Sequence, residues 1–191
     1  MTDTASVPAI PASVSSRGPS DRFAGWIAVL AGVFSIVMGT SQLVFPQDED
    51  PAIDPRTRVL LVLFTLVLWS LVVVYLTLAR RAGSRWPAWV ASAGTVLLTV
   101  GTLSSAINGI DLEFFPYVAI VANGLWIVGS IALGVSLLRA RRVRVSLTWP
   151  LFLVPVLSIF GSQLGGGIPV GAYLLLLAVA LLRGKADRQA A

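Results

Sequence analysis

Long apolar segments alternate with short polar segments along most of the chain. Six of these segments carry no internal charge, and they comprise residues 23–45, 59–79, 86–107, 117–138, 145–164 and 168–182. A helix needs about 20 consecutive apolar residues to cross the ~30 Å hydrocarbon core of a bilayer. The pattern therefore predicts an all-α integral membrane protein, a bundle of six transmembrane helices.

The last two apolar segments contain residues that interrupt helices. Pro150 and Pro155 are expected to kink the fifth helix. The sixth segment has only 15 residues, which extend about 22 Å as a helix, so it must borrow neighbouring residues or thin the bilayer. Residues 165–169, GGGIP, separate the two segments and do not continue a helix at low cost. The sequence leaves open whether the two segments cross completely or form a re-entrant hairpin.

The composition agrees with a membrane protein and removes several kinds of chemistry. Hydrophobic residues make up 56% of the chain and charged residues 12%, whereas soluble domains carry about 25% charge. A soluble domain is therefore excluded. The chain has no His and no Cys, and its single Lys is Lys185, which excludes disulfides, His or Cys metal ligands and a Schiff-base lysine inside the membrane. We expect no cofactor and no metal site.

Basic residues lie in alternate connections between the apolar segments. Twelve of the fourteen are in the N-terminal segment, the second and fourth connections and the C-terminal tail: Arg17, Arg22, Arg80, Arg81, Arg85, Arg139, Arg141, Arg142, Arg144, Arg183, Lys185 and Arg188. The first and third connections carry six acidic residues against Arg56 and Arg58. Because basic residues stay on the cytoplasmic side, both termini are predicted to be cytoplasmic. The positive net charge is thus explained by topology and not by nucleic-acid binding.

The two ends of the chain differ in composition from the predicted membrane domain, residues 23–182. Residues 1–22 are rich in Ser, Pro and Ala without periodicity, which predicts a disordered cytoplasmic segment. Residues 183–191 form a basic cytoplasmic tail. Thirteen Arg against one Lys is typical of a GC-rich bacterial genome, so we expect the plasma membrane of a bacterial cell.

Two of the apolar segments resemble each other. Residues 31–40, AGVFSIVMGT, and residues 93–102, AGTVLLTVGT, share four of ten positions at an offset of 62. Each segment is followed by an acidic connection and then by a segment that contains Leu-Trp, at Leu68-Trp69 and Leu125-Trp126. We interpret this as a repeated helical hairpin. Chance similarity in a chain rich in Ala, Gly, Val and Leu is the alternative.

Glycines recur at seven-residue intervals in the first and third segments, at Gly25, Gly32, Gly39, Gly94 and Gly101. This spacing places them on one face of each helix. Helices in lipid associate through close packing at small residues. We therefore predict that these glycines are helix-packing positions.

Four amides lie in the half of the predicted bundle opposite the termini: Gln42, Asn108, Asn123 and Gln163. They belong to the first, third, fourth and fifth segments or their ends, and several Ser and Thr residues accompany them. If these helices surround a cavity that opens to the outside, the amides are candidate ligand-binding residues. The alternative is that they only form hydrogen bonds between helices.

Few residues in the sequence suit catalysis. Asp111 and Glu113 are paired acids next to a membrane surface, where they are candidates for a transferase or hydrolase, but solvated loop charges explain them as well. The arginine clusters of residues 80–85 and 139–144 are suited to anionic lipid head groups or an acidic partner, although topology already explains them.

Three functions follow from these features. The first is a non-catalytic multispanning plasma-membrane protein that packs against membrane-protein partners or lipids. The second is an uncoupled transporter or binding protein for a small neutral or amphipathic ligand in the outward-facing polar cavity. The third, with the least support, is an enzyme that uses Asp111 and Glu113.

Overall fold

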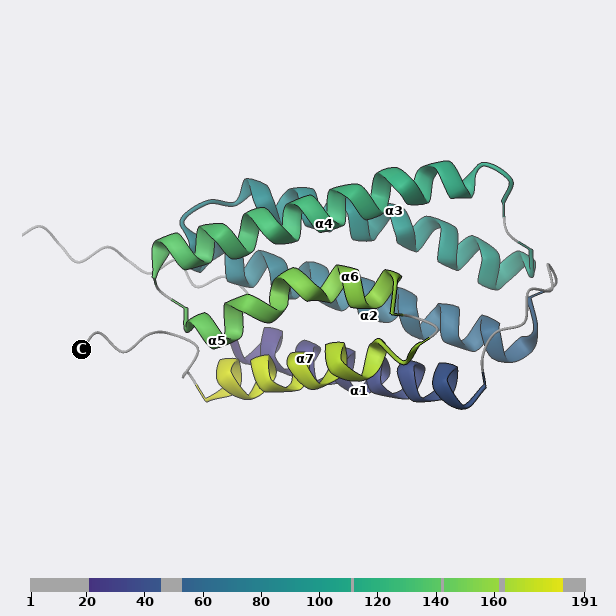
Figure 1. Ribbon diagram of the computed structural model, residues 1–191, viewed down its shortest axis with the longest axis horizontal. Coiled ribbons are helices and arrows are strands. Elements are labelled where there is room, and N and C mark those ends of the chain that lie inside the picture. Colours follow the sequence, from purple (N-terminus) through teal and green to yellow (C-terminus); the bar gives the residue numbers. More distant parts are fainter. Residues whose placement is uncertain (1–20, 46–52, 111, 142, 162–163, 184–191) are drawn as a thin grey trace, which may run out of the picture.

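The computed structural model describes residues 21–45, 53–110, 112–141, 143–161 and 164–183. Within these ranges all regular elements are helices (Figure 1), which confirms the predicted all-α class. Residues 1–20 and 184–191, most of the two predicted terminal segments, lie outside the described residues. Helix α1 begins at Asp21, inside the segment for which the sequence predicts disorder.

Four helices are long and apolar enough to cross a membrane. They are α1 (Asp21–Val44), α2 (Pro55–Ala82), α3 (Trp86–Asn108) and α4 (Phe115–Ala140). The shortest has 23 residues, which extend about 34 Å. Their ends agree with the first four predicted segments to within about four residues, because a proline lies at the first or second position of each of α2, α3 and α4 and a glycine follows α2 and α3. The helices include a few of the charged residues that flank the apolar segments.

The predicted fifth span differs from the observed one. The chain forms α5 (Val145–Thr148), the 3₁₀ helix η1 (Trp149–Phe152) and α6 (Leu153–Ile159), so the helical run ends five residues before Leu164. Pro150 lies in the 3₁₀ turn, where its missing N–H does not break an α-helical bond. The hydroxyl of Tyr173 donates a hydrogen bond of 2.9 Å to the carbonyl of Leu147, which compensates for the irregular backbone at this point.

A turn between α6 and α7 (Gly167–Leu182) makes the end of the chain a helical hairpin. Gly165 adopts φ of 74°, a left-handed conformation that a glycine adopts without strain. The N–H of Gly166 donates to the carbonyl of Gly161 at 2.6 Å. The turn lies short of the end of the bundle that α2, α3 and α4 reach (Figure 1), and both helical arms, with 15 and 16 residues, are shorter than the four long helices.

Helix α2 lies at the centre of the bundle. It packs against α1 on one side and against α3 and α4 on the other, while α7 packs along α1. Leu68, Leu71, Val74 and Tyr75 of α2 are almost completely buried. At the start of α2, the side chain of Asp54 accepts a hydrogen bond from the backbone N–H of Thr57, and hydrogen bonding with Thr57 lowers the pKa of this carboxyl.

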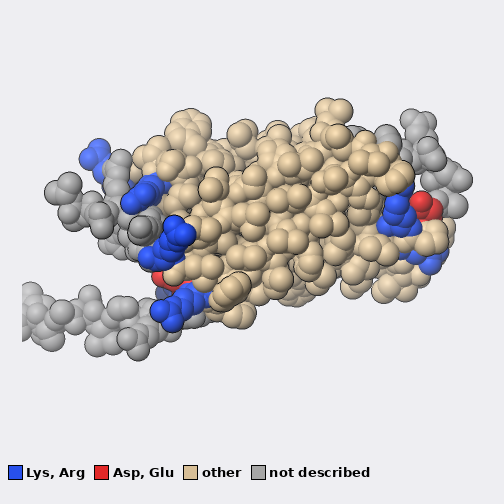
Figure 2. Space-filling view, turned by 90° about the horizontal axis from the view of Figure 1, so that it is seen from below, with Lys and Arg blue, Asp and Glu red and all other residues tan. Residues whose placement is uncertain are grey.

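The surface of the bundle has the distribution expected of a helix bundle in lipid. Large apolar side chains are exposed along its length, and charged residues gather at the two ends with a belt free of described charged residues between them (Figure 2). Exposed Trp86, Trp89 and Trp149 lie near one end and exposed Phe114 and Tyr117 near the other. Aromatic residues at both edges of an apolar belt are typical of the membrane–water interface.

Candidate ligand-binding cavity

A partly open cavity of about 150 Å³ lies between α1, α2 and the C-terminal hairpin. The lining residues come from two helices near the beginning of the chain and two near its end. The lining residues are Ser35, Met38 and Gln42 of α1, Leu60, Leu61, Phe64 and Val67 of α2, Ser158 of α6, and Gly167 and Val170 of α7.

The cavity is mainly apolar, with a few polar groups. Gln42 is 9% exposed and Ser35 is 4% exposed, so both polar side chains are inside the bundle, and half-buried Ser158 adds a second hydroxyl. No charged residue is among those that line it in the described part of the chain. A site of this kind suits an uncharged molecule, because a buried charge without a partner is costly.

The hairpin helps to form the cavity because its turn is built from glycines. Gly167, the first residue of α7, contacts the backbone of α1 at Ser35 and Gly39. This contact, which a side chain at position 167 would prevent, holds the beginning of α7 against α1. Ser158 and Gly167 lie on either side of the turn, so the hairpin forms one side of the cavity.

Of the three predicted ligand-binding amides that the structure describes, Gln42 alone is among the lining residues of this cavity. Asn108 is exposed at the end of α3 and donates a hydrogen bond of 3.1 Å to Ser104 of the same helix. Asn123 lies on α4, outside the set of lining residues, and Gln163 lies outside the described residues. The walls come from α1, α2, α6 and α7, whereas the sequence pointed to the first, third, fourth and fifth segments.

Asn123 is unusual because part of its polar side chain is buried without a hydrogen bond to any described residue. Its Oδ1 atom is buried and has no hydrogen-bond partner within the described residues. A buried carbonyl oxygen without a partner costs about 1–3 kcal/mol. The side chain is half-buried at the surface of α4, so it adds no lining to the cavity between α1 and α2.

The repeated glycines lie at helix contacts. A Cβ atom added at Gly39 would lie 2.6 Å from the backbone nitrogen of Ile168, and one at Gly32 would lie 2.8 Å from Leu175, so these glycines, together with Gly25, face α7. Gly94 faces the backbone of α4 at Ala122 and Trp126, and Gly101 faces the ring of Phe115. The contribution of these contacts to the stability of the bundle stays a prediction.

The proposed repeat stays a prediction. The matching glycines have different neighbours, since Gly32 and Gly39 face α7 whereas Gly94 and Gly101 face the adjacent helix α4. The matching tryptophans differ too, because Trp69 is 54% exposed and Trp126 is completely buried.

Sequence reasoning did not identify the main polar contacts between α2 and its neighbours. The hydroxyl of Tyr75 accepts hydrogen bonds from Trp126 Nε1 at 2.8 Å and from Ser130 Oγ at 3.2 Å. The hydroxyls of Thr65 and Thr102 are 2.8 Å apart. The three- and four-residue spacing of Ser92, Thr95, Thr99 and Thr102 in α3 was a signal for such a face, and all four residues are buried.

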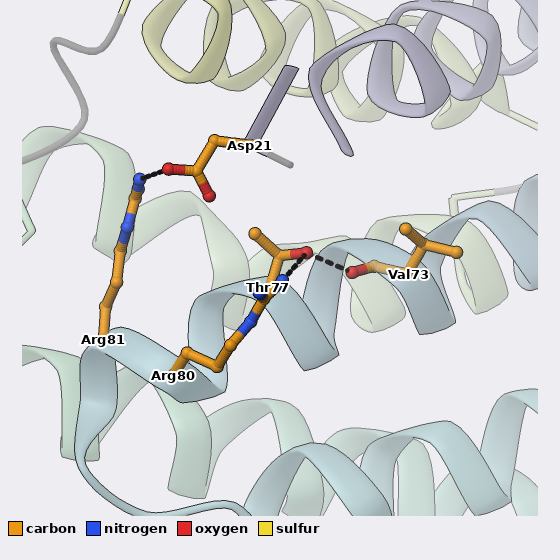
Figure 3. Close-up of polar contacts among 5 residues, drawn as sticks. All are labelled: Asp21, Val73, Thr77, Arg80 and Arg81. Carbon is orange, nitrogen blue, oxygen red and sulfur yellow. Dashed lines mark hydrogen bonds and ion pairs between the residues drawn. The ribbon is translucent and has the colours of Figure 1, made fainter. Parts of the chain in front are cut away.

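One end of the bundle is rich in arginine. Its described charged residues are Arg22, Arg80, Arg81, Arg85, Arg139, Arg141, Arg144 and Arg183 against Asp21, eight positive charges and one negative, or +7. Arg81 of α2 and Asp21 of α1 form an ion pair of 2.8 Å (Figure 3). Arg80 donates to the hydroxyl of Thr77 at 3.2 Å, and that hydroxyl donates to the carbonyl of Val73.

The opposite end has balanced charge in the described residues. It carries Arg56 and Arg58 against Asp54 and Glu113. Arg56 donates a hydrogen bond to the carbonyl of Phe45 and lies 4.9 Å from the centre of its ring. Glu113 is exposed, and its predicted catalytic partner Asp111 lies outside the described residues.

Comparisons of this chain with models of protein families, with curated proteins and with solved structures find no match. Its function is therefore inferred from its own residues.

Proposed function

We propose that this chain is a multi-pass membrane protein that binds a small, uncharged, largely apolar ligand, without catalysis of its own. As a binding protein or an uncoupled transporter, it holds the ligand in the cavity between α1, α2 and the hairpin. The observation that supports this proposal is the lining of the cavity, in which the amide of Gln42 and two hydroxyls stand among apolar side chains. Pockets of this composition orient a ligand through a few polar groups.

The size of the cavity restricts the ligand. A cavity of about 150 Å³ accommodates a molecule of roughly benzene size, or one end of a longer molecule. The amide of Gln42 both donates and accepts hydrogen bonds. The proposed ligand therefore has an apolar body and one hydroxyl, carbonyl or amide group.

This proposal predicts different behaviour for two compounds of similar shape. In lipid nanodiscs, Gln42→Leu is expected to raise the Kd for benzyl alcohol about three- to tenfold, the value of one hydrogen bond. The same substitution is expected to change the Kd for toluene less than twofold, because the apolar walls remain. Binding is measured by the concentration dependence of the thermal midpoint for the wild type and the variant. The Kd values of the wild type and the variant are compared for the same compound, so the partitioning of that compound into lipid affects both values equally.

Two further variants serve as controls. Asn108→Leu removes an exposed amide at a helix end and is expected to leave both affinities unchanged. Leu61→Trp places a larger side chain at the half-buried edge of the cavity and is expected to weaken both compounds. If neither compound binds the wild type, or if Gln42→Leu and Leu61→Trp leave both affinities unchanged, the cavity is not a ligand site. The function is then packing against membrane partners.

We also infer that the chain crosses a bacterial plasma membrane six times with both termini in the cytoplasm. Support comes from the arginine-rich end, at +7 for the described residues, which fits the cytoplasmic side. Because four long helices are an even number of crossings, they return the chain to the side on which it began. Both arms of the hairpin also connect to the arginine-rich end (Figure 1). With this arrangement, the proposal that both termini are cytoplasmic holds whether or not the hairpin crosses the whole bilayer.

This topology is testable with two cysteine variants, because the chain has no cysteine of its own. Glu113→Cys, at an exposed position before α4, is expected to react with an impermeant thiol reagent in intact cells. Ser84→Cys, in the connection between α2 and α3, is expected to react only after the membrane is permeabilised. The reverse pattern of labelling would show that the orientation is inverted.

A further inference from the structure

The end of α4 has a backbone conformation that packing does not explain. Arg141 follows α4 with φ of 53° and ψ of 16°, and among the described residues it is the one non-glycine residue with positive φ. Helices α2 and α3 end with the same left-handed conformation at Gly83 and Gly109. A side chain with a Cβ is strained there, so glycine would be the more stable choice at position 141.

The side chain of Arg141 is not required for the cap. Its backbone N–H donates to the carbonyls of Leu137 and Leu138 at 3.2 and 3.3 Å, and a glycine would make the same bonds. The side chain is also exposed, so no core packing holds it. What arginine adds to glycine at this position is a guanidinium group at the surface.

Other exposed arginines lie near Arg141 in the sequence. Arg139 is in the last turn of α4 and Arg144 precedes α5, and both side chains are exposed. Asp21 is the one described acidic residue at this end, and its carboxylate bonds to Arg81 (Figure 3). The described residues thus offer little negative charge to the corner between α4 and α5.

The neighbouring tryptophans indicate the depth of this corner in a bilayer. Trp149, just after α5, is 61% exposed, and Trp86 and Trp89 at the start of α3 are also exposed. Exposed tryptophans at the edge of an apolar belt lie at the level of the lipid head groups. The exposed guanidinium groups are therefore at the level of lipid phosphates, for which arginine is well suited because its planar group forms paired hydrogen bonds.

We propose that Arg139, Arg141 and Arg144 form a binding site for the head group of an anionic phospholipid at the corner between α4 and α5. The strained conformation of Arg141 is retained because it positions one of the three guanidinium groups. This site is separate from the cavity beside Gln42 and does not depend on the ligand proposed there. It is also independent of which side of the membrane the corner faces.

The test uses the full chain purified in a neutral detergent. Adding phosphatidylglycerol is expected to raise the Tm of the wild type, whereas phosphatidylcholine and inorganic phosphate at equal concentration are not. Arg141→Gly is expected to raise the Tm without lipid by about 2–4 °C, since strain is relieved. The same variant is expected to need about fivefold more phosphatidylglycerol for half of the shift, as one interfacial charge is lost.

Two variants separate charge from strain and position. Arg141→Lys keeps the positive charge but not the paired hydrogen bonds of the guanidinium group, so it is expected to recover part of the lipid response. Arg58→Gln, at the opposite end of the bundle, is expected to leave the lipid response unchanged. An equal response of Arg141→Gly and the wild type to phosphatidylglycerol would overturn the proposal. An equal response to phosphatidylcholine, an equal response to inorganic phosphate or an equal loss in Arg58→Gln would also overturn it.

Discussion

Replacing Gly94 by alanine is expected to lower the free energy of unfolding by about 1–3 kcal/mol, the usual cost of overpacking a close contact. The added Cβ atom would lie 2.5 Å from the carbonyl oxygen of Ala122 and 2.5 Å from the backbone nitrogen of Trp126. Both atoms belong to the backbone of α4, so no side chain can rotate away and the two helices must separate. Reversible unfolding in mixed micelles measures the loss.

Gly124 provides a matched control in α4. A Cβ atom added at Gly124 has no neighbour within 4 Å. Gly124→Ala is therefore expected to raise the free energy of unfolding by up to about 1 kcal/mol, because alanine has the higher helix propensity. Gly39→Ala, which meets the backbone of Gly167 and Ile168, is expected to behave like Gly94→Ala. Similar changes at all three positions would show that close backbone packing does not hold the bundle together.

Tyr75→Phe is expected to lower the free energy of unfolding by about 1–3 kcal/mol through the loss of one hydroxyl group. That hydroxyl accepts hydrogen bonds from Trp126 Nε1 and Ser130 Oγ, and both donors are completely buried. Neither lipid nor water reaches them, so the variant leaves two buried donors without this acceptor. The loss is therefore expected to exceed the average of about 0.6 kcal/mol for a hydrogen bond between membrane helices.

A double-mutant cycle separates this effect from a change in packing. In the Tyr75→Phe background, Ser130→Ala removes a donor that has already lost its acceptor, so it is expected to cost less than it does in the wild type. Tyr117→Phe, at a position that is 74% exposed, is the control and is expected to have no effect. If Ser130→Ala lowers the free energy of unfolding equally in the wild type and in Tyr75→Phe, the Tyr75 hydroxyl does not hold these helices together.

The positions of the long helices and of the charged ends were predictable from the sequence. In a bilayer the helix interior must satisfy its own backbone hydrogen bonds, and apolar side chains must cover it. Uncharged runs such as residues 59–79 therefore reveal helices directly, and clusters such as residues 139–144 reveal their ends. The prolines and glycines of the last two segments also showed where the chain is irregular, although not that the helical run would end at Ile159.

The neighbours of each helix were decided only by the tertiary structure. The seven-residue spacing identified a face of α1 with Gly32 and Gly39, but it did not show that this face meets α7, whereas Gly94 meets α4. Lipid and protein are equally apolar, so hydrophobicity does not determine which helix faces form a pair. Complementary shape determines it, and shape depends on residues far apart in the sequence.

The candidate site shows the same division. The sequence marked Gln42 as a polar residue inside an apolar segment, and it marked Asn108 on the same grounds. Only the folded bundle places Gln42 in a cavity with Ser158 and Gly167, while Asn108 lies exposed beside Ser104. The polar residues of a membrane protein are thus evident from sequence, but which of them face a cavity depends on how the helices rotate against one another when they pack.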